Sequence, residues 1–116
     1  HKTSSGIYVR SKSESIIDTY LFINKIPFRY ECKLTLGSTV CFPTFTIRHP
    51  ATGEVYYWEH FDCMEDPKYA KRVAPILNAY ISHGIIPSIN LITTYESSDY
   101  PLDSDTVRKI VEHYFL

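Results

Sequence analysis

The sequence predicts one mixed α/β domain in which helices pack against a central sheet. Its 116 residues match the usual size of a single domain, and 44% of them are hydrophobic, which is enough for one packed core. Helix-like and strand-like patterns follow one another in the order helix, three strands, helix, strand, helix. A helix between the third and fourth strands requires a crossover connection, so we expect parallel as well as antiparallel pairs in the sheet.

The polar start of the chain, which contains Gly6, predicts a flexible lead-in over residues 1–8 and a single domain over residues 9–116. Ser11-Lys12-Ser13-Glu14 has the form of a capping box, in which side chains satisfy the free amides at a helix start. Apolar residues at helical spacing follow, and Pro27 ends the segment. These features predict the first helix.

The three strands come next. Apolar and polar residues alternate from Phe28 to Leu34, which predicts a strand with one polar face. Gly37 and Ser38 turn the chain. The runs Cys41–Arg48 and Glu54–Phe61 are rich in β-branched and aromatic residues and flank a short turn, so they predict an antiparallel hairpin.

The second helix is predicted to begin with Asp66 as its cap and Pro67 at its first position, and to end at Gly84. Pro75 lies inside this segment and lacks an amide hydrogen, so it should kink the helix at a cost of about 3 kcal/mol. The apolar run Ile85–Tyr95 predicts a buried fourth strand. A last helix is predicted after a cap at Asp103 or Ser104, with its apolar stripe formed by Val107, Ile110, Val111 and Tyr114.

Charge and cysteine content exclude several classes of protein. A net charge of −1 argues against a generally basic nucleic-acid coat, although it is compatible with a local patch. No apolar run approaches the roughly 20 residues that cross a bilayer, so we expect no membrane partner. Cys32, Cys41 and Cys63 form no CxxC pair, which is typical of core cysteines in a cytoplasmic protein, with zinc binding beside His60 as the alternative. Because the chain begins with His1 and not Met, we expect a C-terminal fragment of a longer protein that has an additional N-terminal domain.

Three side chains are candidates for a functional site. Glu59 lies in an aromatic strand, where an unpaired buried carboxylate is costly, so either a site or an ion pair with Arg48 or another cation must account for it. His60 is either a ligand or base, or a half-buried histidine with satisfied hydrogen bonds. Glu14 is either a site residue or the reciprocal half of the capping box.

Short motifs that cover almost the whole chain point to a family. They are Val9-Arg10-Ser11-Lys12-Ser13-Glu14, Pro27-Phe28-Arg29-Tyr30-Glu31, Pro43-Thr44-Phe45-Thr46-Ile47, Tyr57-Trp58-Glu59-His60-Phe61, Asp66-Pro67-Lys68-Tyr69-Ala70 and the Asn90–Thr94 strand. Together with the element order, these motifs resemble the PD-(D/E)xK nuclease superfamily, in particular a bacterial branch with a Trp-Glu-His motif on its third strand. The resemblance implies a restriction-endonuclease-like fold.

The resemblance also implies metal-assisted hydrolysis of DNA. Carboxylates on neighbouring strands of such a site hold Mg²⁺ or Mn²⁺, which activates a water molecule and stabilises the charge that develops on the phosphate. By the resemblance, Glu59, Thr44, Glu14 and the weaker candidate Glu31 are expected to bind the metal. Glu59, His60 and Glu14 are the expected catalytic residues, with His60 orienting or deprotonating the water.

The chain departs from the family pattern within this expected site. Thr44 stands where the family has its central metal-binding Asp, so one negative charge is missing. Phe61 stands where the family has the lysine of its motif, two residues after Glu59. Strand alternation places His60 on the face opposite Glu59 unless the strand bulges. Ile76 stands where relatives tend to carry a basic residue. This pattern is typical of a fold that is kept after its catalysis has lapsed.

Four basic residues are candidates for contacts with DNA: Lys12, Lys68, Lys71 and Arg72. They form either a phosphate-facing patch or the solvated face of their helices. Three functions are therefore open: a weakened metal-dependent nuclease, a non-catalytic nuclease-fold module that binds nucleic acid or a protein partner, and an active parent protein of which Thr44 is a variant.

Overall fold

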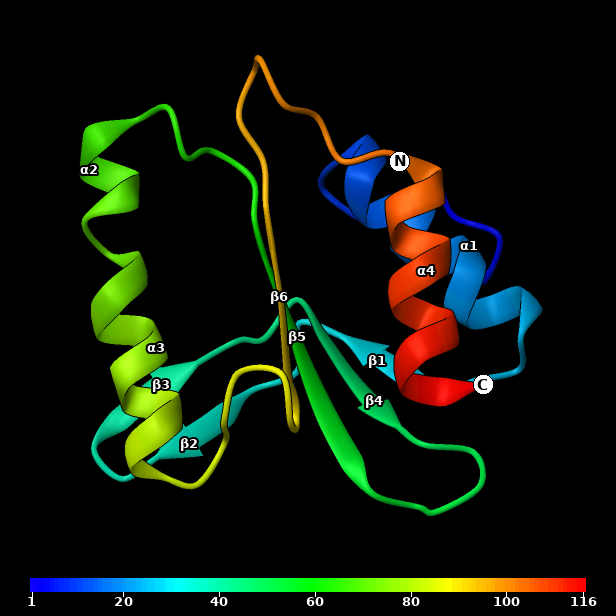
Figure 1. Cartoon of the computed structure of the whole chain (residues 1–116), viewed down its shortest axis with the longest axis horizontal. Coiled ribbons are helices and arrows are strands. Elements are labelled where there is room, and N and C mark those ends of the chain that lie inside the picture. The colour runs from blue at the N-terminus through cyan, green and yellow to red at the C-terminus, as the bar shows by residue number, and fades with distance from the viewer.

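The computed structural model describes all 116 residues and contains a four-stranded mixed sheet of order β1-β4-β5-β6 (Figure 1). Its strands are β1 (Phe28–Tyr30), β4 (Phe45–Arg48), β5 (Val55–Phe61) and β6 (Leu91–Tyr95), and a separate two-stranded sheet consists of β2 (Leu34–Leu36) and β3 (Thr39–Cys41). The helices are α1 (Lys12–Ile23), α2 (Pro67–Ala70), α3 (Val73–Ser82) and α4 (Ser104–Phe115). The predicted mixed sheet flanked by helices is confirmed.

The sheet combines both kinds of strand pair, as the predicted crossover requires. β1 and β5 both run antiparallel to β4, whereas β6 runs parallel to β5. The chain reaches β6 from the end of β5 through α2 and α3, which is the connection that a parallel pair needs. Strand alternation then directs Trp58 and His60 to one face of β5, and Tyr57, Glu59 and Phe61 to the other.

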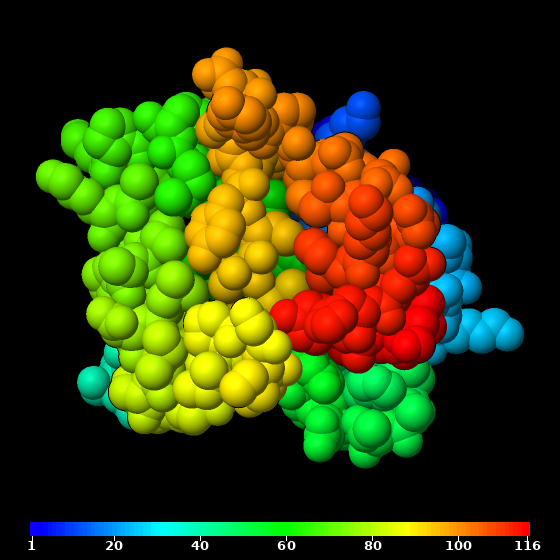
Figure 2. Space-filling view, viewed as in Figure 1, coloured from blue at the N-terminus to red at the C-terminus, as the bar shows by residue number.

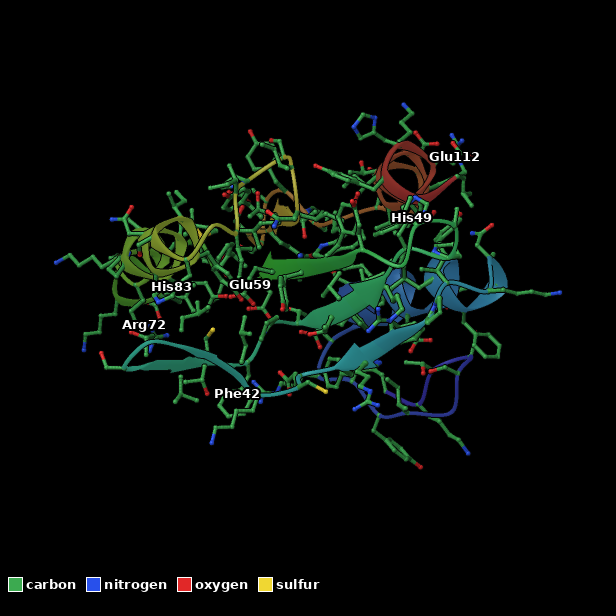
Figure 3. All side chains as sticks on the ribbon, turned by 90° about the horizontal axis from the view of Figure 1, so that it is seen from below. Phe42, His49, Glu59, Arg72, His83 and Glu112 are labelled. Carbon is green, nitrogen blue, oxygen red and sulfur yellow. The ribbon has the colours of Figure 1, made fainter.

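Each face of the sheet has its own apolar core. On the Trp58 face, α1 and α4 contribute Leu21 and Val111 to a cluster of ten buried residues. On the opposite face, α3 contributes Tyr80 to a smaller cluster with Leu36 and Leu91. Figure 3 shows this division: α4, with its labelled Glu112, lies on one side of the sheet, and Glu59 lies on the other side, toward α3 and the β2–β3 hairpin.

The predicted central hairpin is confirmed, although its first arm is shorter than expected. β4 and β5 pair from Phe45 opposite Trp58 to Arg48 opposite Val55. Cys41, the expected first residue of this arm, belongs to β3. The interruption lies at Pro43, which has no amide hydrogen to donate to a ladder.

The single strand predicted from Phe28 to Leu34 is wrong. Glu31 adopts a left-handed conformation with φ of 50°, which ends β1 and turns the chain away from the sheet. Leu34 instead begins β2, which pairs with β3 across the turn at Gly37. The structure therefore contains an additional hairpin that the sequence did not predict.

The second predicted helix is two helices, α2 and α3, with a break at Lys71 and Arg72. The break lies one turn before Pro75, which is the turn that the predicted disruption by this proline affects. Pro75 is the third residue of α3, where a backbone amide has no carbonyl one turn earlier within the helix, so the missing amide hydrogen removes no helical bond. The first such bond runs from the Ile76 amide to the Arg72 carbonyl, at 3.3 Å.

The strand predicted from Ile85 to Tyr95 is confirmed only in its second half, β6. Before it the chain turns: Ser88 has φ of 73°, and the Asn90 side chain accepts a hydrogen bond from the Ile86 amide at 2.6 Å. A side-chain oxygen that satisfies a local amide stabilises such turns, which the apolar pattern alone does not reveal.

The helix caps agree with the prediction. The Ser11 hydroxyl accepts a hydrogen bond from the Glu14 amide at 3.2 Å, and Asp103 caps α4 by accepting one from the Thr106 amide at 2.7 Å. Residues 1–8, the expected lead-in, form a turn that contacts α1, where the Ser5 hydroxyl donates to Asp18 Oδ2 at 2.6 Å.

The surface shows where the parallel edge of the sheet lies. In Figure 2 the segment from β6 to the start of α4 is visible between the α3 and α4 sides of the molecule. No helix combines the length and the apolar composition that a membrane span requires. The cysteines Cys32, Cys41 and Cys63 are free thiols.

Candidate binding cavity

A cavity of about 870 Å³ opens on the Glu59 side of the sheet, between the start of α1, the ends of β1 and β5, strand β3, and helices α2 and α3. The charged side chains among its lining residues are Arg10, Glu14, Glu31, Glu59, Asp62 and Arg72. Thr44 also lines the cavity. The four positions that the sequence predicts as metal ligands, Glu14, Glu31, Thr44 and Glu59, therefore lie around one cavity although they come from four different parts of the chain.

Glu59 lies within β5 and is 9% exposed. The Thr44 amide donates a hydrogen bond to Glu59 Oε1 at 3.2 Å, and the second carboxylate oxygen accepts none. Burial raises the pKa of Glu59 to about 7; the Thr44 hydrogen bond opposes this rise and the negative charge of Glu31 adds to it. The alternative ion pair with Arg48 is absent, because the Arg48 guanidinium donates instead to the Gly53 carbonyl at 2.8 Å.

Glu14 lines the cavity and also forms a hydrogen bond at the start of α1, so it has features of both roles that the sequence left open, a site residue and part of the capping box. It is only 5% exposed, and its Oε1 accepts hydrogen bonds from the Tyr30 hydroxyl at 2.6 Å and from the Arg10 amide at 3.0 Å. In a capping box the Glu14 side chain would accept a hydrogen bond from the Ser11 amide. Here it accepts one from the amide of Arg10, the residue before the cap. This carboxylate is held by neutral donors alone.

Glu31 is the acid with a positive partner. Its carboxylate lies 3.1 Å from the Arg10 guanidinium, and the Arg10 side chain is 75% exposed. Burial raises the pKa of Glu31, the Arg10 charge opposes the rise, and the Glu14 charge adds to it. An ion pair with a partner this exposed is weak, because water screens the charges.

Thr44 supports Glu59 structurally. Its side chain is buried, and its hydroxyl oxygen accepts a hydrogen bond from the His60 amide at 3.0 Å, while its own amide binds Glu59. Thr44 thereby ties the chain before β4 to β5. It contributes no negative charge to the cavity.

His60 is among the residues that line the cavity, but its ring does not share the cavity with Glu59. Its side chain is fully buried, with Nδ1 2.7 Å from the Thr94 hydroxyl and Nε2 2.8 Å from Glu96 Oε1. Trp58 Nε1 also donates to the Thr94 hydroxyl, at 3.0 Å. These contacts lie on the face that α1 and α4 cover, so His60 has no access to a water molecule held by Glu59.

Glu96, which sequence reasoning missed, is the centre of this second polar group. It accepts hydrogen bonds from the Ser13 hydroxyl at 2.7 Å and from the Leu102 amide at 3.0 Å, in addition to the contact with His60. Although burial alone would raise the pKa of Glu96, these hydrogen bonds outweigh it and lower the pKa. An acid directly after a buried strand was the available sequence signal.

The residues of the cavity do not fit a divalent metal ion. No group of three histidine, cysteine, aspartate or glutamate side chains is arranged to hold one. Glu31 is paired with Arg10, and Glu14 Oε1 already accepts two hydrogen bonds, so two of the expected ligands are engaged by groups of the protein itself. Mg²⁺ and Mn²⁺ prefer several oxygen ligands in a fixed geometry, and Thr44 supplies no third charge.

Tyr80 is fully buried in the smaller core and is not among the residues that line the cavity. Its hydroxyl has no hydrogen-bond partner at ordinary distance, and Cys41 packs against the same core. Burial raises the pKa of Tyr80, and Glu59 and Cys41 add to the rise, so the hydroxyl stays protonated.

Only one of the four basic candidates lines the cavity. Arg72 lines the cavity and lies 5.4 Å from the centre of the Tyr69 ring, on the α3 side of the view in Figure 3. Lys12, Lys68 and Lys71 are exposed outside the cavity lining. Lys68, Lys71 and Arg72 follow closely on three exposed acids, Asp62, Glu65 and Asp66.

In comparison with known proteins, the chain matches no family model, no curated protein and no solved structure. Membership of the PD-(D/E)xK superfamily therefore stays a prediction from the sequence motifs.

Proposed function

We propose that the chain is a non-catalytic nuclease-fold module whose cavity binds a positively charged segment of a protein partner. The observation that carries this proposal is the position of Glu14, Glu31, Thr44 and Glu59 around one cavity. These are the positions that the nuclease resemblance marks, and they lie on a mixed sheet flanked by helices. In this proposal, a common ancestry with the nucleases accounts for their position.

The same cavity lacks the parts that cleavage needs. Metal-assisted hydrolysis depends on a cation that activates water and neutralises the phosphate, and the cavity offers no set of ligands for one. His60, the expected base, lies on the other face of the sheet. The chain therefore has no residue placed to replace the metal.

Charge favours a protein partner over DNA. Without a metal, the carboxylates of Glu14, Glu31, Glu59 and Asp62 repel phosphate groups, and only two arginines oppose them. At the rim, Val40 and Phe42 are 50% and 56% exposed on or beside β3. Exposed apolar side chains beside an acidic cavity suit an amphipathic peptide with basic residues.

The test of lost catalysis compares the unmodified chain with Thr44→Asp. We expect neither protein to bind Mg²⁺ or Mn²⁺ saturably in calorimetry or to cleave plasmid or single-stranded DNA. Cleavage by the unmodified chain would contradict the proposal. Cleavage by Thr44→Asp alone would show that a single ligand separates this chain from an active nuclease, which supports the ancestry.

The test of the partner is a selection from a random peptide library with the purified chain. We expect the selected peptides to be enriched in Lys and Arg, and labelled DNA of mixed sequence not to bind in fluorescence anisotropy at physiological salt. Salt-dependent DNA binding that Arg72→Ala weakens, or a selection without basic enrichment, would contradict the proposal.

A further inference from the structure

Two buried carboxylates in the cavity have no positive partner. Glu14 and Glu59 are 5% and 9% exposed, and neither takes part in any of the five ion pairs of the structure. Burying a carboxylate without a counter-charge is costly, and the hydrogen bonds from Tyr30, Arg10 and Thr44 to these acids come from neutral donors. A cation bound in the cavity that both acids line would reduce this cost.

One acceptor at the same place is unused. Glu59 lines the cavity, and its carboxylate accepts a single hydrogen bond, from the Thr44 amide to Oε1. More than 90% of buried polar groups in folded proteins are hydrogen-bonded, so the second oxygen of this largely buried side chain is open to a donor from a ligand. The chain's own cation, Arg10, is committed to Glu31.

The walls of the cavity suit an organic cation better than a metal ion. Phe42, Phe61 and Tyr69 supply aromatic surface, and Val40 and Ile76 supply aliphatic surface. Aromatic rings attract cations through their faces, and the aliphatic stem of a long basic side chain packs on apolar surface. About 870 Å³ is ample space for one such side chain.

We propose that the cavity receives one arginine side chain of the protein partner, with Glu59 and Glu14 as its counter-charges. Arginine is favoured over lysine because its planar guanidinium carries five donors, enough to serve two separate carboxylates, and is more weakly hydrated than an ammonium group. This inference rests on the proposed function and names the chemical group that the cavity recognises.

The experiment is a two-dimensional NMR titration of the chain with N-acetyl-arginine amide. The matched neutral probe is N-acetyl-citrulline amide, and N-acetyl-lysine amide is the second cation. We expect saturable shifts for residues around the cavity with the arginine probe, weaker shifts with lysine and none with citrulline. Glu59→Gln should weaken binding about tenfold or more, whereas Glu112→Gln on α4, far from the cavity, should leave it unchanged.

The outcomes separate this inference from the proposed function. Equal binding of arginine and citrulline, stronger binding of lysine, or an unchanged affinity in Glu59→Gln overturns the arginine site. If selected basic peptides bind equally well to Glu59→Gln, the chain is a binding module that uses another surface. If neither basic peptides nor the arginine probe bind, the proposed function itself is wrong.

Discussion

Glu59 is a carboxylate that the folded protein prefers to keep protonated. Its pKa rises to about 7 because the side chain is buried, whereas an ordinary glutamate ionises near 4.5. At a pH below the unfolded-state pKa, Glu59 is neutral in both the folded and the unfolded protein, and its ionisation does not lower the free energy of unfolding. As pH rises toward 7, Glu59 ionises more easily in the unfolded state. The free energy of unfolding therefore falls, by about 3 kcal/mol in total.

The change Glu59→Gln should abolish this pH dependence. Glutamine keeps an oxygen that can accept the Thr44 hydrogen bond and has no charge to bury. We expect the variant to be more stable than the unmodified chain by about 1–3 kcal/mol at pH 8, and of similar stability at pH 4. Urea unfolding at both pH values measures this difference. If Glu59→Gln and the unmodified chain differ in stability by the same amount at pH 4 and at pH 8, Glu59 ionises normally.

Tyr80 carries a buried hydroxyl that has no hydrogen-bond partner at ordinary distance. Removing a buried polar group without a partner is neutral or favourable, so Tyr80→Phe should raise the free energy of unfolding by about 0–1 kcal/mol. Phe45→Leu, at another fully buried aromatic of the sheet, is the control and should destabilise. A clear loss of stability in Tyr80→Phe would show that the hydroxyl has a partner.

At the scale of elements, the Glu96 group holds helices and strands together. It connects Ser13 of α1, His60 of β5 and the Leu102 amide before α4. Glu96→Ala would leave several buried donors without an acceptor, so we expect a loss of about 2–4 kcal/mol in chemical unfolding. Glu112→Ala removes an exposed carboxylate paired with Arg108 and should cost less than 1 kcal/mol. Similar losses for the two variants would contradict this account.

The two helix starts give a paired prediction. Asp103→Ala removes the cap of α4 and should cost about 1 kcal/mol, because the Thr106 amide loses its acceptor. Pro75→Ala should change stability by less than about 0.5 kcal/mol, since Pro75 interrupts no helical hydrogen bond. Thermal unfolding of both variants measures these effects. A large gain in Pro75→Ala would indicate that the proline strains α3.

Elements were predictable where local chemistry decides them. The Ser11 and Asp103 caps and the β4–β5 hairpin follow from short motifs, and the structure confirms them. The break after β1 could not be predicted, because the left-handed conformation of Glu31 occurs at a residue type that rarely adopts it. Likewise, the position of Pro75 is harmless only because α2 and α3 are separate helices.

At the scale of the whole molecule, the sequence predicted which residues line the candidate site but not which contacts these residues make. The motifs identified four residues that line one cavity, and strand alternation foresaw that His60 faces away from Glu59. The sequence could not show that Arg10 pairs with Glu31 or that Tyr30 binds Glu14. These contacts depend on where distant segments of the chain meet. They engage two of the carboxylates that a metal ion would need as ligands.

The most direct test of the account is a calorimetric titration of one sample of the chain, first with Mg²⁺ and then with N-acetyl-arginine amide. The account predicts no saturable heat with Mg²⁺ and a saturable heat with the arginine probe that Glu59→Gln abolishes. Saturable Mg²⁺ binding that Glu59→Gln abolishes, with no response to the arginine probe, would contradict it and would identify the cavity as a working metal site.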